Sequence, residues 1–294
     1  MDFQLELRNR VADIEQIIKK YLPQEEGLQR TVIEAMNYSV MVGGKRLRPM
    51  LMKETFKLFG GDAEVIEPFM AAIEFIHTYS LVHDDLPALD NDEYRRGKKT
   101  THAVYGEAMG ILAGDALLNY AFETATKALE LELSANTAKA LQVLASKAGI
   151  YGMIGGQVVD VESENKKVSM ETVKFIHELK TGALIESAML IGAILGGATE
   201  EEQASIQQIA LNIGFAFQIQ DDILDVTSST EELGKPVGSD EKNQKSTYVG
   251  LKGLEQAKQD VEVLSNRAIA ELQALPNRNT FLEELIRELI KRRK

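Results

Sequence analysis

The sequence predicts an all-α protein, and three observations support that prediction. Apolar residues recur at three- and four-residue spacing along almost the whole chain, which is the pattern of amphipathic helices. No segment shows a convincing alternation of apolar and polar residues, as a half-buried strand would. The chain holds only six prolines, and most of them fall at or near the ends of the helical segments. We therefore expect a helical bundle.

The helical segments follow one another along the chain. Apolar side chains from Leu5 to Ile18 mark the first helix. Pro87 should end the fourth segment, because proline lacks a backbone N–H and disfavours a helical residue before it. No linker rich in Pro, Ser or Gly divides the chain, so we expect one domain over residues 1–294. After the first helix, the segments cover residues 28–42, 47–59, 64–85, 103–130, 135–161, 169–195, 200–226, 246–273 and 279–291.

Composition narrows the class of protein. The formal net charge of −12 makes nonspecific nucleic-acid binding a poor hypothesis. The chain has no cysteine, which excludes disulfides and thiolate chemistry and fits a reducing compartment. Its most apolar stretch, Gly182 to Ala198, is interrupted by Glu186 and is shorter than the ~20 residues of a membrane span. We expect a cytoplasmic protein without stable membrane insertion.

Two aspartate clusters with similar sequences begin 137 positions apart, each at the end of an apolar helical segment. Their carboxylates would repel one another unless cations lay between them. Oxygen ligands without His or Cys nearby favour a hard divalent ion, Mg²⁺ before Zn²⁺. We interpret the pair as two walls that hold a diphosphate through shared metal ions. The candidate ligands are Asp84, Asp85, Asp90, Asp221, Asp222 and Asp225.

The two clusters differ in how specific they are. His77 and Asp84 share a helical face, and Asp90 can return toward them after the break at Pro87. Taken alone, this first cluster is equally typical of a solvated helix end followed by an acidic loop. Asp221 and Asp225 share a face in a strongly apolar helix, where unpaired carboxylates would be costly. The second cluster therefore favours metal binding more strongly.

Cationic residues form two further clusters, Gly43–Pro49 and Arg95–Lys99. Arginine forks and lysine point charges suit diphosphate, although each cluster alone is more often a solvated loop. Beside an acidic metal site they indicate a second diphosphate, held by Lys and Arg. Lys180-Thr181-Gly182 interrupts an apolar helix, and it is either a packing kink or part of a cavity wall. The same choice applies to Gln157.

One long polar stretch runs from Thr227 to Thr247. It holds many charged residues and glycines, with Leu233 and Val237 as its only bulky apolar residues. A polar connection of this length in a compact domain is often a lid or a binding loop. We expect a lid here.

Seven motifs occur in order over most of the chain: GGKRLRP, HTYSLVHDDLPALDND, RRG, GGQVVD, KTG, FQIQDDILD and GKPVGSD. By these motifs the sequence resembles the trans-type short-chain polyprenyl synthases, and within them the bacterial farnesyl diphosphate synthases. The resemblance implies the isoprenoid synthase fold, a helical bundle around a large central cavity. It also implies a homodimer and three Mg²⁺ ions per active site. One departure is that Lys98-Lys99-Thr100 stands where the family commonly has Lys-Pro-Thr, which puts the stiffness of that loop in doubt.

The resemblance assigns roles to the motif residues. Asp84 and Asp90 would hold metal on one wall and Asp221 on the other, supported by Asp85, Asp222 and Asp225. The allylic diphosphate would be met by Arg95, Lys180 and Lys235. Isopentenyl diphosphate would be held by Lys45, Arg48, His77 and Arg96, beside the Gly44 backbone, with Gln157 as a further substrate contact. The reacting carbons would lie against Thr181 and Gln218.

The implied activity is Mg²⁺-dependent prenyl transfer by ionisation, condensation and elimination. Isopentenyl diphosphate would be joined to dimethylallyl and geranyl diphosphate, giving farnesyl diphosphate and diphosphate. A geranyl or geranylgeranyl diphosphate synthase, a class I terpene cyclase and a non-catalytic isoprenoid-binding partner subunit are the alternatives. The cyclase fits less well, because such enzymes usually carry an Asn/Ser/Glu second metal motif, whereas Asp221-Asp222-Ile-Leu-Asp225 is all aspartate.

Product length would depend on the floor of the cavity below the first aspartate motif. The resemblance places an aromatic stop at Tyr79, five residues before Asp84, which is consistent with a fifteen-carbon product. Helix geometry alone puts Ser80, one turn before Asp84, more directly in line. Both residues are candidates for the floor, and the alternative is that Tyr79 is only a core aromatic residue.

Overall fold

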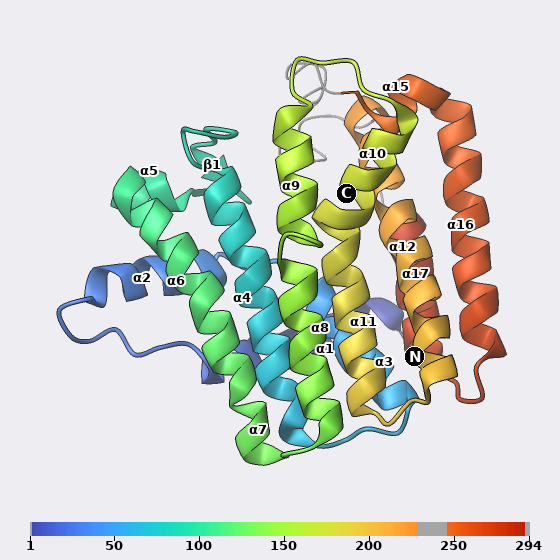
Figure 1. Ribbon diagram of the computed structural model, residues 1–294, viewed down its shortest axis with the longest axis horizontal. Coiled ribbons are helices and arrows are strands. Elements are labelled where there is room, and N and C mark those ends of the chain that lie inside the picture. The colour runs from blue at the N-terminus through green and yellow to red at the C-terminus, as the bar shows by residue number, and fades with distance from the viewer. Residues whose placement is uncertain (1, 228–245, 292–294) are drawn as a thin grey trace. The chain divides into compact units, whose positions relative to one another are not determined.

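The computed structural model describes residues 2–227 and 246–291, which are helical apart from turns, loops and one short hairpin (Figure 1). The all-α prediction is confirmed. The chain divides into two compact units, the first with Met1–Lys53 and Ala63–Leu141, the second with Glu54–Asp62 and Gln142–Lys294. Single-domain organisation and the central cavity stay predictions. Lys235 and most of the polar stretch 227–247 lie outside the described residues.

The first unit is built around helix α4 (Glu67–Asp84), which packs along α6 (Glu107–Thr126) (Figure 1). Residues 64–84 are long and apolar enough to cross a membrane, but 78% of the most apolar window is buried inside the protein. That burial is typical of the core helix of a globular protein. The other elements are α1 (Phe3–Lys20), α2 (Arg30–Met41), α3 (Leu47–Leu58), η1 (Glu64–Ile66), β1 (Tyr94–Arg95), β2 (Lys98–Lys99), α5 (Thr101–Tyr105), α7 (Ala128–Leu131) and α8 (Ala135–Ala148), of which α3 and α8 continue into the second unit.

Two local features of this unit differ from the sequence prediction. The predicted helix 103–130 is three helices, and the first break is at Gly106, whose φ of 86° suits glycine. The segment after the first aspartate motif is an antiparallel hairpin, with Arg96 (φ 53°) and Gly97 (φ 75°) at its turn. The Thr100 N–H donates to the Glu93 carbonyl at 3.0 Å and closes the hairpin. Backbone pairing therefore constrains the loop around Lys98 and Lys99.

In the second unit α12 (Glu200–Thr227) packs against α16 (Leu254–Ala274) and α11 (Ala183–Leu195) (Figure 1). The predicted helix 135–161 is broken between Ala148 and Met153, where a Cβ on Gly152 would lie 2.1 Å from the Lys147 carbonyl oxygen. The predicted helix 169–195 contains a π-helical turn, η2 (His177–Gly182). The remaining elements are α9 (Met153–Glu162), α10 (Met170–Ile176), α15 (Tyr248–Lys252) and α17 (Thr280–Lys291).

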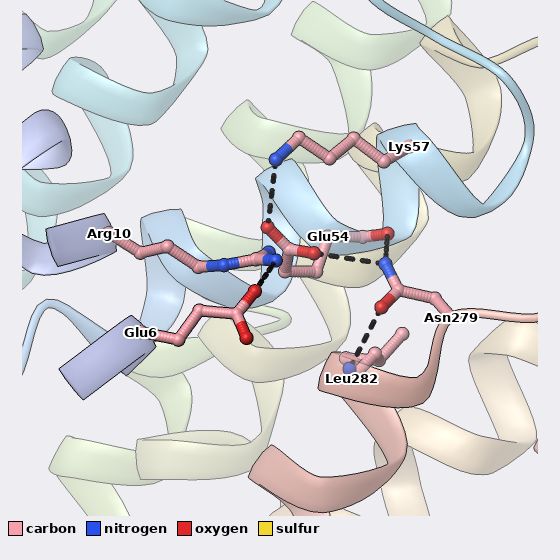
Figure 2. Close-up of polar contacts among 6 residues, drawn as sticks. All are labelled: Glu6, Arg10, Glu54, Lys57, Asn279 and Leu282. Atoms are coloured by element: carbon pink, nitrogen blue, oxygen red, sulfur yellow. Dashed lines mark hydrogen bonds and ion pairs between the residues drawn. The ribbon is translucent and has the colours of Figure 1, made fainter. Parts of the chain in front are cut away.

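The last helix is held by a polar contact to α3 (Figure 2). Asn279 caps α17 by accepting a hydrogen bond from the Leu282 N–H at 3.0 Å. Its amide nitrogen donates to the Glu54 backbone carbonyl at 3.0 Å and to the Glu54 carboxylate at 2.9 Å. Glu54 is 1% exposed, so its carboxylate depends on such partners.

We expect Asn279→Ala to lower the melting temperature, because it removes the helix cap and two hydrogen bonds at Glu54. Caps and buried hydrogen bonds of this kind contribute ~2 kcal/mol together, or about 5 °C in a chain of this size. Differential scanning fluorimetry measures the change. The control is Thr280→Ala, at the exposed neighbouring position, and equal melting temperatures for the two variants would contradict the role of Asn279.

Candidate active site

The first aspartate motif begins at the C-terminal end of α4. The helix ends at Asp84, and the chain then turns so that the Asp90 N–H donates to the Asp84 carbonyl at 2.9 Å. A second turn bond joins the Asn91 N–H to the Leu86 carbonyl at 3.1 Å. The break after Asp84 therefore returns Asp90 to the helix end, as the sequence predicted from Pro87.

Asp85 points away from solvent and pairs with the hairpin. Its carboxylate lies 2.8 Å from Arg95 Nε and 2.6 Å from Arg95 Nη2. Burial raises the pKa of Asp85, while the Arg95 charge acts in the opposite direction. Asp85 thus positions Arg95, whereas the Asp84 side chain is half-buried and Asp90 is exposed at the surface. Arg95 is therefore fixed beside the acidic motif that it was predicted to serve.

The next residue of the hairpin, Arg96, reaches in another direction. Its guanidinium donates to the Gly43 carbonyl in the loop between α2 and α3. A Cβ on Gly44 would lie 2.6 Å from Arg96 Nη1, so a larger residue at this position would require the guanidinium to move. Two consecutive arginines at the turn thus serve two places: Arg95 the aspartate motif, and Arg96 the glycine-lysine-arginine loop.

His77 of α4 belongs to the same cationic group as that loop. Burial lowers the pKa of His77 well below its ordinary value, and the charges of Arg48 and Arg96 lower it further. Its imidazole is neutral at pH 7 and can hydrogen-bond to an anion without adding charge. Lys45 is exposed to solvent beside them. The first unit therefore brings together Gly44, Arg48, His77 and Arg96, four of the residues assigned to isopentenyl diphosphate.

The two candidates for the cavity floor are distinguished by their surroundings. Tyr79 is 6% exposed, and its ring meets the His83 ring edge-on at 5.7 Å. Burial raises the pKa of Tyr79 to about 12, so the hydroxyl is neutral. The Ser80 hydroxyl folds back onto its own helix and donates to the His77 carbonyl at 2.9 Å. One turn below Tyr79, Phe75 is fully buried and packs on Tyr120 at 5.8 Å between ring centroids.

The second aspartate motif lies in the last turns of α12. Asp221 is half-buried and accepts a hydrogen bond from the Gln218 amide at 3.2 Å. Asp222 is buried and accepts from the Tyr248 N–H at 2.7 Å. Asp225 is also buried, at 4% exposure. Asp221 is therefore the most accessible carboxylate of the three, which agrees with its assignment as the metal ligand of this wall.

Lys180 and Thr181 lie in the π-helical turn, where the backbone departs from regular α-helix. Two glycines allow neighbouring helices to approach this turn closely: a Cβ on Gly156 would lie 2.2 Å from Lys180 N, and one on Gly214 would lie 2.9 Å from Gly182 Cα. π-turns are frequent at functional sites. The sequence allowed two interpretations of this interruption, a packing kink and a cavity wall. The close helix packing supports the first, and the second stays a prediction. Gln157 is half-buried on α9, next to Gly156.

Two buried groups were given no role from the sequence: Asp160 on α9, and His177 within the π-helical turn itself. Lys180 Nζ donates to Asp160 Oδ2 at 2.7 Å, and Asp160 is 9% exposed. His177 lies 3.8 Å from Asp222, and burial lowers the pKa of His177 to about 4, so its imidazole is neutral at pH 7. Asp160 could have been found from the sequence, because it follows Gln157 by one helical turn in GGQVVD.

We expect Asp160→Asn to lower kcat/KM by about tenfold or more, roughly 1.4 kcal/mol of transition-state binding, because Lys180 loses the partner that orients it. Steady-state kinetics with the allylic diphosphate varied measures the loss. Glu162→Gln, an exposed change on the same helix, is the control. Wild-type kinetics for Asp160→Asn would show that Lys180 is oriented without Asp160.

In residues 2–227 and 246–291, no group of three or more His, Asp or Glu side chains could by itself hold a metal ion.

An all-α chain with two aspartate motifs, and with Arg and Lys clusters beside one of them, defines an isoprenoid synthase that acts on diphosphates. The chain matches the polyprenyl synthetase family over residues 29–281. It belongs to that family, and it is a short-chain trans-prenyltransferase with the isoprenoid synthase fold.

Relatives and solved structures agree with this assignment. The chain is 44% identical to a geranylgeranyl diphosphate synthase from Cyanophora paradoxa, over 92% of this chain and 90% of the relative. It is also 44% identical to a farnesyl diphosphate synthase from Geobacillus stearothermophilus, over 86% and 85% of the two chains. A geranyltransferase from Helicobacter pylori, solved in complex with magnesium and isoprenyl diphosphate, has a TM-score of 0.85 at 34% identity, covering 99% of this chain and 97% of its own.

Proposed function

We propose that the protein condenses isopentenyl diphosphate with dimethylallyl and then geranyl diphosphate, releasing farnesyl diphosphate and inorganic diphosphate. The divergence of Arg95 and Arg96 carries this proposal. Arg95 is held against Asp85 of the metal motif, and Arg96 against Gly43 of the lysine-arginine loop. Two adjacent anion sites suit two diphosphate substrates, whereas a terpene cyclase needs a site for one.

The residues present fit Mg²⁺ as the metal. All six candidate ligands are carboxylates, and Mg²⁺ usually takes one or two of them per ion and completes its coordination with water and phosphate oxygens. Asp84, Asp90 and Asp221 are the more accessible members of their motifs and would hold the ions. A neighbour solved with magnesium and isoprenyl diphosphate supports the same metal, and we propose three ions per site. When bound, Mg²⁺ neutralises charge on the leaving diphosphate.

Side chains of this protein bind and orient the two diphosphate substrates. Arg95 and Lys180 donate hydrogen bonds to the allylic diphosphate and stabilise the charge that develops as its C1–O bond breaks. Arg48, His77 and Arg96 hold isopentenyl diphosphate so that its C4 attacks that carbon at close range. Lys235, which lies outside the described residues, is assigned to the allylic diphosphate by the resemblance alone.

Neutral dipoles stabilise the allylic cation that forms when the C1–O bond breaks. The Thr181 hydroxyl, the carbonyl of the π-helical turn and the Gln218 amide oxygen face the allylic carbons and lower the energy of the positive charge. After the new C–C bond forms, a proton leaves C2 of the isopentenyl unit for the departed diphosphate. Gln157 adds a neutral contact to the substrates. No nucleophilic side chain takes part, so the site has no need of cysteine or a Ser/His pair.

The fifteen-carbon product is supported by Tyr79, a buried aromatic side chain below the first motif. Relatives do not decide the matter, because a farnesyl and a geranylgeranyl diphosphate synthase share the same identity with this chain. Geranylgeranyl diphosphate is therefore the second candidate product. A non-catalytic isoprenoid-binding subunit would be expected to lose motif acids, and all six aspartates are present.

Product analysis tests the proposal. The protein is incubated with Mg²⁺, dimethylallyl diphosphate and labelled isopentenyl diphosphate, and the dephosphorylated alcohols are separated by chain length. Farnesol as the main product, lost on adding EDTA and restored by Mg²⁺, is the expected result. Geranylgeraniol or geraniol would keep the mechanism and overturn the assignment of the floor. Absence of any condensation would favour the binding subunit.

We also propose that the protein acts as a cytoplasmic homodimer. Complete lack of cysteine fits a reducing compartment, and cell fractionation would test the location. Ile111 and Leu112 on α6 are 42% and 48% exposed, which suits a face that a second copy covers. We expect Leu112→Glu to shift the mass measured by light scattering from that of a dimer toward that of a monomer, whereas Glu123→Gln on the same helix should not. A monomeric wild-type protein would contradict the proposal.

A further inference from the structure

Arg46, in the middle of the GGKRLRP motif, is buried, whereas Lys45 is exposed and Arg48 is half-buried. Its side chain is 1% exposed, and Nη1 lies 2.7 Å from Glu74 Oε1, itself 3% exposed. Nη2 donates to the Val40 carbonyl at 2.8 Å, and Nε lies 3.6 Å from the Glu15 carboxylate. One arginine thus joins the loop before α3 to α1, α2 and α4.

The loop carries a conformational cost at this residue. Arg46 has φ of 48°, in the left-handed region that residues with a Cβ rarely adopt. Burying two charges is also unfavourable unless each is paired and hydrogen-bonded. Such costs persist where the surrounding contacts determine the conformation. The contacts of Arg46 with Glu74 and Val40 are of that kind, because they bind both ends of the guanidinium.

Both members of the pair are close in sequence to residues of the candidate anion site. Arg46 stands between Lys45 and Arg48, and its carbonyl accepts the hydrogen bond of the Met50 N–H at 3.1 Å, which begins α3. Glu74 precedes His77 by three residues on α4, nearly one helical turn. The ion pair therefore links the loop that carries Lys45, and the first turn of α3 that carries Arg48, to the turn of α4 that carries His77.

We propose that Arg46 and Glu74 are positioning residues for isopentenyl diphosphate: their buried ion pair sets the spacing between His77 and the segment with Lys45 and Arg48, where the loop meets α3. This inference rests on the proposed function, because it assigns the pair to the second diphosphate site of that reaction. Neither residue touches the substrate. A diphosphate requires several donors at matched spacing, so a loop released from α4 binds it more weakly even though every ligand remains.

Glu74→Gln tests the inference, since it removes the charge and keeps the shape of the side chain. We expect the KM for isopentenyl diphosphate to rise about tenfold or more, with the KM for the allylic diphosphate changed by less than about threefold. Calorimetric titration with isopentenyl diphosphate alone should show the same loss of affinity. Glu74→Asp keeps the charge and should retain more affinity for isopentenyl diphosphate than Glu74→Gln. If Glu74→Gln folds poorly, the affinity of Glu74→Asp is compared with that of the wild-type protein instead.

The matched control is Glu186→Gln in the second unit. Glu186 is also 3% exposed and forms an ion pair with Lys147 at 2.6 Å, so its loss removes a similar buried charge. This control should lower the melting temperature and leave isopentenyl diphosphate binding unchanged. Glu74→Gln with a lower melting temperature but wild-type affinity would overturn the inference, because the pair would then support stability alone.

Failure of the inference and failure of the proposed function give different results. If the wild-type protein forms no condensation product yet binds isopentenyl diphosphate more tightly than Glu74→Gln, the reaction is wrong and the positioning role stands. If the wild-type protein forms farnesyl diphosphate and Glu74→Gln has the same KM for isopentenyl diphosphate, the reaction stands and the positioning role is wrong.

Discussion

Replacing Asp84 with asparagine is expected to lower kcat/KM by ~10³-fold or more, and Asp221→Asn should do the same. Each change keeps the size of the side chain and removes one charge from the more accessible part of a motif. The loss of a metal ligand at a developing diphosphate charge amounts to several kcal/mol of transition-state stabilisation. Initial rates at saturating Mg²⁺, with both substrates varied in turn, measure the effect.

The control for this experiment is Asp92→Asn, two residues after Asp90. The Asp92 side chain is 54% exposed and its carboxylate lies 3.9 Å from Arg95, so we expect less than about threefold change. A rate for Asp84→Asn within tenfold of wild type would show that the first motif is a solvated acidic loop. Partial recovery of Asp84→Asn at high Mg²⁺ or Mn²⁺ concentration would support the metal role, because mass action compensates for weaker binding.

Tyr79→Ala is expected to change the main product from fifteen to twenty carbons. The side chain is buried, and its removal opens space along α4 just below the first aspartate motif. The next obstacle is the contact between Phe75 and Tyr120, one helical turn or about 5.4 Å lower. Since that pair remains in place, extension should stop after about one further isoprene unit. Chromatography of the dephosphorylated alcohols measures the product distribution.

Two further variants make the Tyr79 result specific. Ser80→Ala should leave the product unchanged, because the Ser80 hydroxyl is bonded to the His77 carbonyl of its own helix. The double change Tyr79→Ala with Phe75→Ala should give products longer than either single change. Because a large-to-small core change costs ~3–5 kcal/mol, the folded fraction is measured alongside, and Tyr79→Leu is the milder variant. An unchanged product from a folded Tyr79→Ala protein would remove Tyr79 from the floor.

The helical class and the family could be predicted from the sequence because they depend on local patterns. The spacing of apolar residues identified helices throughout, and Pro87 correctly predicted the end of α4 and the return of Asp90. Breaks at Gly106 and Gly152 were missed, because isolated glycines within an apolar pattern do not announce a positive φ or a close backbone approach. The hairpin at Arg95–Lys99 was missed since its strands are two residues each.

The π-helical turn is a further feature that residue spacing does not predict in full. Lys180-Thr181-Gly182 was recognised as an interruption, but neither its hydrogen-bonding class nor its neighbours Gly156 and Gly214 follow from spacing. The close approach of three segments is a property of packing. The sequence offers Asp160 as a candidate, but its pairing with Lys180 depends on the packing of α9 against the π-helical turn.

The sequence by itself determined the class of chemistry: all-aspartate motifs, arginine and lysine clusters, no cysteine, and helices to carry them. Those features are local in the chain, and the residue types alone limit what they can bind. The tertiary structure decided which partner each charged side chain binds. Arg46, Arg95 and Arg96 are alike in sequence, yet one is buried against Glu74, one is held by Asp85 and one crosses to Gly43. Burial and the choice of partner separate these roles, and both depend on segments far apart in the chain.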